Sequence, residues 1–436
     1  MNKVRRRQKF IDEGKRQLGL ALSLIAVNTL QFSLQLISIM FVGHLGKLPL
    51  SSASMANSFA SVTGFSVLLG MGSALETLCG QAYGAKKPHM LGVYTQRAIL
   101  VLMALSIGLA VIWYHTAFIL LSLGQDKDIS DGAGEFNRWM TPGLFAFGIL
   151  QCLVRFLMAQ KIHILVCWVL VCRLELGIKG AALANGISYW INVLLFAFYI
   201  KFSNGCSESF TGFSRDAFSG ILTFSKLAIP SAIMICLEYW SFEMVVILSG
   251  RLPNPELETS VLSISLNTCW MIYNISVGLG GAVSTRVSNE LGAGNAQRAR
   301  LAVYVAAAIA TTVGLIIGTV TILVRHVWGK VFNNDDEVIR YVAKIIPLLA
   351  LSDFLDGFQC VLSGAAGGCG WQNICAGINL GAYYVVGVPS AVVLASVFHL
   401  RGTGLWTGII LALCVQSVAL INVNLCTNWD KEVSCL

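Results

Sequence analysis

Charged residues are scarce in this chain. Asp, Glu, Lys and Arg make up only 12% of its 436 residues, whereas 56% are hydrophobic. A soluble globular domain carries about 25% charged residues, so the composition excludes that class and favours a protein that lies in a bilayer. The chain also lacks a GxxxxGK[ST] phosphate-binding loop, which argues against an ATP-driven pump.

Cysteine pairs and histidine clusters are missing as well. The 13 cysteines include no CxxC pair and no His spacing suited to a metal, and most lie inside apolar runs. They are interpreted as small apolar residues at helix contacts, with Cys206 as the one candidate for reactivity. We therefore expect no disulfide, no metal site and no cofactor. A membrane enzyme would need His clusters or paired acids at a membrane surface, and the absence of both predicts that the protein is not an enzyme.

What the chain does contain is a series of long apolar runs. They are roughly 20 residues or longer, the length a helix needs to cross a bilayer, and they do not alternate as barrel strands would. The fold class predicted is therefore an all-α polytopic membrane protein. Spans are expected at residues 18–42, 52–78, 98–123, 139–159, 180–200, 221–250, 257–283, 301–327, 340–366, 374–398 and 402–425. A further apolar segment, Ile162–Cys172, is shorter.

The net charge of +8 comes partly from a basic N-terminal segment. Because basic residues flank the cytoplasmic ends of membrane helices, these residues orient the chain, place its N-terminus in the cytoplasm and do not indicate nucleic-acid binding. The first span is too long, and lacks a cleavage site, for a signal peptide. The basic residues are Lys3, Arg5, Arg6, Arg7, Lys9, Lys15 and Arg16.

An internal repeat divides the chain into two halves. Small residues from Gly70 to Ala85 recur from Gly278 to Ala293 at an offset of 208 (278 − 70), and Gln151-Cys152 recurs as Gln359-Cys360 at the same offset (359 − 151). Farther on, Gly180 matches Gly402 at 222 (402 − 180). Such duplication is typical of transporters built from parallel repeats.

The change of offset predicts that the first half lacks about fourteen residues (222 − 208), and the gap falls at Ile162–Cys172. The expected fold has about twelve helices in two six-helix lobes, with the fifth helix truncated. We expect this fifth segment to be retained as a short or tilted crossing. The domains predicted are a basic cytoplasmic tail, an N-terminal lobe, a polar cytoplasmic linker, a C-terminal lobe and a short tail, at residues 1–17, 18–202, 203–220, 221–425 and 426–436.

Three local sequences are more specific: Gly80–Ala85 (GQAYGA), Arg286–Asn295 (RVSNELGAGN) and Gly370–Gln372 (GWQ). With them, the chain from about Gln17 to Glu432 closely resembles the plant multidrug and toxic compound extrusion (MATE) transporters, the detoxification proteins. The resemblance implies a central cavity that opens alternately to each side, and antiport of organic solutes against protons. One departure is Ser23, where the family usually has a proline that bends the first span.

Four carboxylates lie well inside predicted spans, where an ionisable group costs several kcal/mol and needs a reason to be there. Glu238 and Asp356 are the principal candidates for proton and substrate binding, and the resemblance assigns the same pair. Their first-half counterparts, Gln31 (238 − 207) and Gly148 (356 − 208), cannot ionise, so function should be concentrated in the second half. The other two carboxylates are Glu243 and Asp353.

Uncharged residues complete the predicted site. Asn267 is included in the site; in the alternative interpretation, the acids are buried for packing and bond to Asn267, a serine or the backbone. Tyr239 and Trp240 could stack on flat organic cations, and Asn28 and Gln31 could line the opposite wall. An apolar surrounding favours the neutral form of a carboxylic acid, so these acids could hold a proton on an acidic side and release it at cytosolic pH.

The resulting prediction is a secondary antiporter, expected to be a monomer, that exports or sequesters small organic compounds in exchange for protons. Xenobiotics, alkaloids, flavonoid-type metabolites and organic cations remain open as substrates, and the membrane is the plasma or the vacuolar membrane. Two alternatives are a flippase of lipid-linked substrates and a transport-impaired truncated isoform. A flippase would need a cationic cavity for phosphate, and the acidic residues here count against it.

Overall fold

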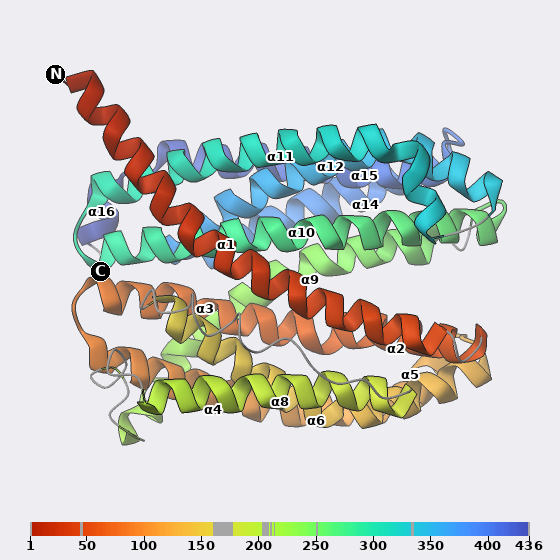
Figure 1. Cartoon of the computed structure of the whole chain (residues 1–436), viewed down its shortest axis with the longest axis horizontal. Coiled ribbons are helices and arrows are strands. Elements are labelled where there is room, and N and C mark those ends of the chain that lie inside the picture. Colours follow the sequence, from red (N-terminus) through yellow and green to blue (C-terminus); the bar gives the residue numbers. More distant parts are fainter. Residues whose placement is uncertain are drawn as a thin grey trace. The chain divides into compact units, whose positions relative to one another are not determined.

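A computed structural model describes residues 2–43, 47–159, 178–202, 209, 212, 214–249, 252–332 and 335–434. Every regular element in these ranges is a helix (Figure 1), which confirms the all-α prediction. Two sequence predictions fall outside the described residues: the short segment Ile162–Cys172 and the reactive Cys206.

The chain divides into two compact units. One consists of Met1–Ile25, Leu237–Leu291 and Asn295–Leu436, and we call it the C-terminal unit. The other, the N-terminal unit, consists of Ala26–Cys236 and Gly292–Gly294. The first 25 residues therefore belong with the second half of the chain.

The C-terminal unit contains the first part of α1 (Asn2–Gly43) and the second part of α9 (Ile221–Ser249). Its remaining helices follow in chain order as α10 (Pro255–Gly292), α11 (Ala296–Phe332), α12 (Asp336–Cys369), α13 (Gln372–Asn379), the π-helix η3 (Leu380–Gly387), α14 (Val388–Ser396), α15 (Arg401–Cys426) and α16 (Trp429–Ser434). Helix α12 packs against α11 and α15, and α15 packs against α14 (Figure 1).

The N-terminal unit is built around α6 (Lys127–Ala159), which packs against the four longest of its neighbours. These are α2 (Lys47–Ala60), α3 (Ser66–Gly84), α4 (Pro88–Tyr114) and α8 (Ile178–Phe202). Shorter elements are the π-helix η1 (Ser61–Phe65), α5 (Thr116–Ser122) and the 3₁₀ turn η2 (Arg215–Ala217). Large side chains such as Trp113, Leu144 and Phe156 are fully buried in the core of this unit.

Eight helical stretches in the described part of the chain are long and apolar enough to cross a membrane, and each overlaps a predicted span. They are Met55–Gly84, Pro88–Tyr114, Lys127–Met158, Ile221–Ser249, Ala296–Phe332, Asp336–Cys369, Gln372–Ser396 and Arg401–Cys426. The other three predicted spans, 18–42, 180–200 and 257–283, lie within α1, α8 and α10.

Local sequence explains several helix boundaries. Helix α1 continues through Ser23. Unlike a proline, serine keeps the backbone N–H that the helix needs for its hydrogen bonds, and its hydroxyl donates to the carbonyl of Gly19 at 3.2 Å. Helix α12 ends at Gly370, which has a φ of 88°. Glycine adopts this left-handed conformation without the steric cost that other residues incur.

Candidate functional site

The centre of the C-terminal unit holds two buried carboxyl groups joined by one amide. Glu238 on α9 is 7% exposed and Asp356 on α12 is 3% exposed. The Nε2 atom of Gln359 donates to Oε1 of Glu238 at 3.1 Å and to Oδ1 of Asp356 at 2.8 Å. Because an amide nitrogen carries two hydrogens, Gln359 can satisfy both carboxyl groups at once.

Two hydroxyl groups complete this arrangement. The hydroxyl of Tyr273 on α10 donates to Oε1 of Glu238 at 3.1 Å, and that of Ser363 donates to Oε1 of Gln359 at 3.2 Å. The second bond holds the amide with its nitrogen toward the acids. We call Glu238, Asp356, Gln359, Tyr273 and Ser363 the acid network.

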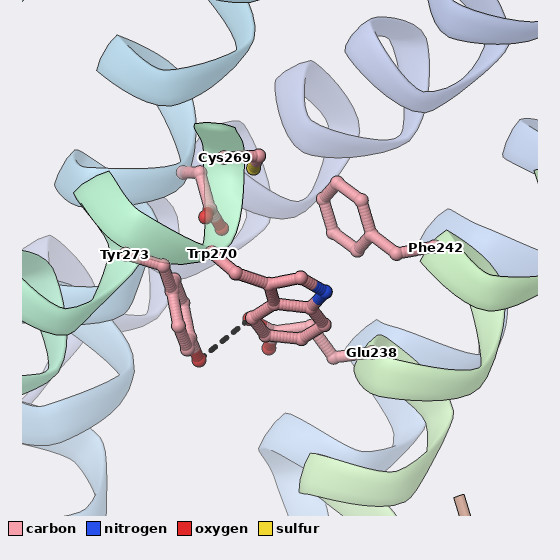
Figure 2. Close-up of a pocket in the computed structure, with 6 residues that line it drawn as sticks. Glu238, Phe242, Cys269, Trp270 and Tyr273 are labelled. Atoms are coloured by element: carbon pink, nitrogen blue, oxygen red, sulfur yellow. Dashed lines mark hydrogen bonds between the residues drawn. The ribbon is translucent and has the colours of Figure 1, made fainter. Parts of the chain in front are cut away.

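A small cavity lies beside the acid network. Its volume is about 10 Å³, about the space that one water molecule needs. Aromatic side chains form much of its wall. Trp270 meets Tyr273 edge-on with ring centroids 5.5 Å apart, and behind it lies Tyr239, whose ring is tilted by 39° at a centroid distance of 4.5 Å. The residues that line the cavity are Glu238, Phe242, Cys269, Trp270, Tyr273 and Asp356 (Figure 2).

A second hydrogen-bonded group lies between η3 and α15. The hydroxyl of Tyr383 donates to Oε1 of Gln416 at 2.9 Å, and Nε2 of Gln416 donates to Oδ1 of Asn379 at 2.8 Å. All three side chains are fully buried. Tyr383 lies in a π-helical segment, and such segments occur frequently at functional sites.

Helical spacing explains how α12 contributes to the acid network. Asp356, Gln359 and Ser363 are separated by three and four residues, so their side chains lie along one face of the helix. That face is turned into the unit, because all three residues are buried. A single helix therefore supplies one acid, the bridging amide and the hydroxyl that orients it.

The structure brings some of the predicted site residues together. Glu238 and Asp356 share Gln359, and Tyr239 lies behind Trp270 at the wall of the cavity. Asp353 is buried one turn before Asp356 on α12.

Other predicted residues lie apart from the acid network. Glu243 is half-buried on α9, Trp240 is 39% exposed, and Asn267 is exposed and donates to the carbonyl of Ser263 on its own helix. Asn28 is half-buried in the N-terminal unit, and the side chain of Gln31 is outside the described set. The amide that bonds to both acids in the structure is Gln359, which was not among the partners considered from the sequence.

Sequence reasoning missed Gln359, Gln416 and Asn379 as site residues. They carry no charge, so the cost of burying a charge could not single them out. For Gln359 two signals existed: its position three residues after Asp356, and its repeat relation to Gln151. In the N-terminal unit the side chain of Gln151 has a different partner, since Nη1 of Arg155 donates to its Oε1 atom as well as to its backbone carbonyl.

Among the described residues, no group of three or more His, Cys, Asp or Glu side chains could hold a metal ion. A separate ionic cluster occurs where the N-terminal part of α1 meets the C-terminal part of α10.

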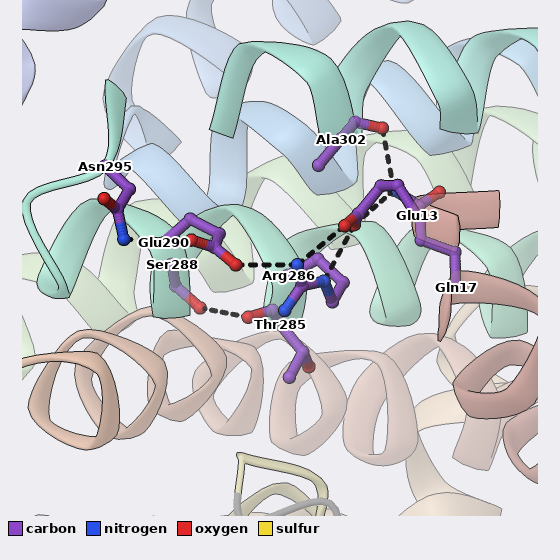
Figure 3. A network of polar contacts seen from close by, with 8 residues as sticks. All are labelled: Glu13, Gln17, Thr285, Arg286, Ser288, Glu290, Asn295 and Ala302. Carbon is purple, nitrogen blue, oxygen red and sulfur yellow. Dashed lines mark hydrogen bonds and ion pairs between the residues drawn. The ribbon is translucent and has the colours of Figure 1, made fainter. Parts of the chain in front are cut away.

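This second cluster joins the N-terminal tail to α10 and α11 (Figure 3). Arg286 donates from Nε and Nη2 to the two carboxylate oxygens of Glu13, each at 2.8 Å, and from Nη2 to Glu290 at 2.7 Å. Gln17 donates to the carbonyl of Ala302 at 2.9 Å. Burial opposes the charge on Glu13, but its bonds to Arg286 and the arginine charge prevail, and the pKa of Glu13 is lowered.

The comparisons with known proteins agree with this fold. The MatE family model matches residues 24–183 and 230–393. The chain therefore belongs to the MATE family of membrane transporters, whose members are not enzymes, and it is an integral membrane protein.

Among curated relatives it is similar to two proteins of Arabidopsis thaliana. Protein DETOXIFICATION 17 is 56% identical over 97% of this chain and 91% of its own length, and Protein DETOXIFICATION 16 is 57% identical over 97% and 90%. The crystal structure of the eukaryotic MATE transporter AtDTX14 matches with a TM-score of 0.92 and 47% identity, over 98% of each chain. The transporter VcmN of Vibrio cholerae shares the fold, with a TM-score of 0.85 at 16% identity.

Proposed function

We propose that this protein is a secondary antiporter that exports or sequesters small organic compounds in exchange for protons. The observation that carries the proposal is the acid network, in which Gln359 joins the buried carboxyl groups of Glu238 and Asp356. Groups of this kind inside a membrane protein are expensive to bury, and they commonly mark ion or proton pathways.

The coupling would work through the charge of the pair. With a proton bound, the two carboxyl groups and Gln359 form a hydrogen-bonded set of lower charge, which suits a closed and dry interior. Without that proton the pair attracts a cation. Since the two forms favour different conformations, a proton gradient could drive the cycle in one direction.

The substrates proposed are flat organic compounds, including organic cations, alkaloids, xenobiotics and flavonoid-type metabolites. Tyr239, Trp270 and Tyr273 present aromatic faces next to Glu238, and such faces attract cations and stack on planar rings. The plasma membrane and the vacuolar membrane are the proposed locations, with a monomer as the working unit. Glu243, Trp240, Asn28, Gln31 and Asn267 stay predictions as substrate contacts.

The alternative of a lipid-linked flippase is less favoured. Phosphate recognition requires cationic side chains, whereas the cavity in the C-terminal unit is lined by two acids, three aromatic residues and a cysteine. The alternative of an impaired isoform depends on Ile162–Cys172, and a transport measurement on the full chain decides it.

Transport into proteoliposomes tests the proposal. The full-length protein is reconstituted, a pH gradient is imposed, and accumulation of ethidium, a planar fluorescent cation, is followed together with collapse of the gradient. We expect Glu238→Gln and Asp356→Asn each to lower gradient-driven accumulation by at least about a hundredfold while leaving the amount of folded protein unchanged. Full transport by either variant would contradict the site assignment.

A further inference from the structure

Asp353 has an unusual environment for a carboxyl group. It lies near the middle of α12 and is only 6% exposed. Neither of its carboxylate oxygens has a hydrogen-bond partner at normal distance among the described residues. The thiol of Cys269 lies beside it, and a thiol is a weak donor.

This environment favours a neutral carboxyl group. An ionised carboxylate without strong donors costs several kcal/mol in an apolar interior, whereas the neutral acid costs much less. Asp356 differs in this respect because Gln359 donates to it at 2.8 Å. The two aspartates on one helix are therefore suited to opposite charge states.

The position of Asp353 connects it with the acid network. It precedes Asp356 by three residues, which places both side chains on one face of α12 about one turn apart. Cys269 lies beside Asp353 and also lines the cavity that Glu238 and Asp356 share. The route from Asp353 to the pair is thus short and passes next to room for about one water molecule.

Other titratable groups around this route come from three neighbouring elements. Helix α9 contributes Glu238, α10 contributes Cys269 and Tyr273, and η3 contributes Tyr383. Helix α15 faces the same turn with Trp406, whose Nε1 donates to the hydroxyl of Ser352 at 3.0 Å. Since the thiol and the two phenols keep their protons at neutral pH in their ordinary state, Asp353 is the group best suited to deliver a proton to the pair.

We propose that Asp353 is the entry residue for protons, which it passes from the extracytoplasmic side to the Glu238 and Asp356 pair. The sidedness follows from the basic N-terminal residues, which predict a cytoplasmic tail. Glu13 of that tail pairs with Arg286 near the C-terminal end of α10, so α11 starts on the cytoplasmic side and the Asp336 end of α12 faces the acidic compartment. Asp353 lies one turn nearer that end than Asp356. This inference rests on the proposed proton-coupled function and assigns a separate role within it.

The transfer balances with one proton. The O–H bond of the Asp353 carboxylic acid breaks, and the proton adds to a carboxylate oxygen of Asp356, directly or through one water molecule. Asp353 is left as a carboxylate without strong donors, so it readily takes up a new proton from the extracytoplasmic side. No electron transfer and no other reactant are required.

The test is a pH-jump experiment on the full-length protein in lipid vesicles. Infrared difference spectroscopy follows the carboxylic C=O bands, with Asp356→Asn identifying the band of that residue. We expect Asp353→Asn to remove one neutral-carboxyl band that wild type shows at neutral pH, and to slow proton arrival at Asp356 at least about tenfold. Asp353→Glu should restore the rate, and the final level of Asp356 protonation should be unchanged.

Ser352→Ala is the matched control. It removes a hydrogen-bonding side chain at the adjacent position but should leave both the band and the rate as in wild type. An unchanged rate in Asp353→Asn would overturn the proposal, as would a shift in the equilibrium protonation of Asp356 with an unchanged rate. Failure of the proposed function is a different result, namely normal ethidium transport by Glu238→Gln and Asp356→Asn.

Discussion

Gln359 offers the sharpest test at the scale of a single residue. Replacing it with leucine keeps a similar volume but removes the donors to Glu238 and Asp356. Hydrogen bonds to charged groups contribute about 1.5–3 kcal/mol, so the ionised pair should become less favourable and proton release slower. We expect gradient-driven ethidium transport by Gln359→Leu to fall by about ten- to a hundredfold, with the largest deficit at high cytoplasmic proton concentration, where proton release is least favoured.

The internal repeat supplies the control for this variant. Gln151 is the repeat counterpart of Gln359 and lies in the N-terminal unit, where its backbone carbonyl accepts a bond from Arg155. Gln151→Leu should leave the dependence of transport on pH unchanged. Equal pH profiles for Gln359→Leu and wild type would show that the bridge does not affect the proton step.

Sequence reasoning selects site residues by the free-energy cost of burying them. It therefore finds charged residues in membrane spans and misses neutral ones. Glu238 and Asp356 were predicted because a carboxylate in a membrane span is costly and is commonly functional. In the structure both accept hydrogen bonds from the amide of Gln359. Gln359 and Gln416 have no such cost on their own. Asn267 seemed a suitable partner by its position in a span, yet its face of α10 is exposed, and a single sequence does not reveal the rotation of a helix whose faces are both apolar.

At the scale of elements, the N-terminal part of α1 contributes to stability as well as to the orientation of the chain in the membrane. Glu13 accepts two bonds from Arg286, and both side chains are buried. Breaking a buried ion pair by removing one partner costs about 3–5 kcal/mol, because the other charge is left unpaired. We expect Glu13→Gln to lower the melting temperature of the purified full-length protein, and the tail to become more sensitive to limited proteolysis.

The effect of pH on this ion pair has a definite sign. The pKa of Glu13 is below its ordinary value of 4.5, so the pair stabilises the fold above that pH and loses its contribution as the pH falls through the lowered value. The gap in melting temperature between wild type and Glu13→Gln should therefore be constant from neutral pH to about pH 5 and narrow in stronger acid. A gap that widens in acid would contradict the assignment.

The contact between α14 and α15 depends on glycine. A Cβ atom on Gly408 would overlap the backbone of Ala391 in α14, and close helix approach of this kind is typical of membrane proteins. Gly408→Ala should destabilise the protein by about 1–3 kcal/mol. Gly377→Ala in α13 is the control, because a Cβ there meets nothing within 4 Å. Thermal unfolding in detergent distinguishes the two, and equal melting temperatures would count against tight packing at Gly408.

At the scale of the whole molecule, hydropathy gave the number and order of most helices but not their ends. Membrane spans are predicted from the apolar core of each helix, whereas the helices continue past it. Helix α10 extends to Gly292 rather than 283, and α1 begins at Asn2 rather than 18. The polar ends, which include Glu13 and Arg286, form the contacts that a hydropathy pattern cannot show.

The source of energy is a property of the whole protein, and it gives the last prediction. The chain has no phosphate-binding loop, and the candidate acids Glu238 and Asp356 lie in one unit, so transport should follow the proton gradient alone. In proteoliposomes without ATP, we expect an acid-outside gradient to drive ethidium export against its concentration, and a protonophore to abolish that export within the time the gradient takes to collapse. A sodium gradient at equal pH on both sides serves as the control and should drive nothing. Uphill export that persists without a proton gradient but requires sodium would replace the proton with sodium as the coupling ion, while leaving the fold and the acid network as described.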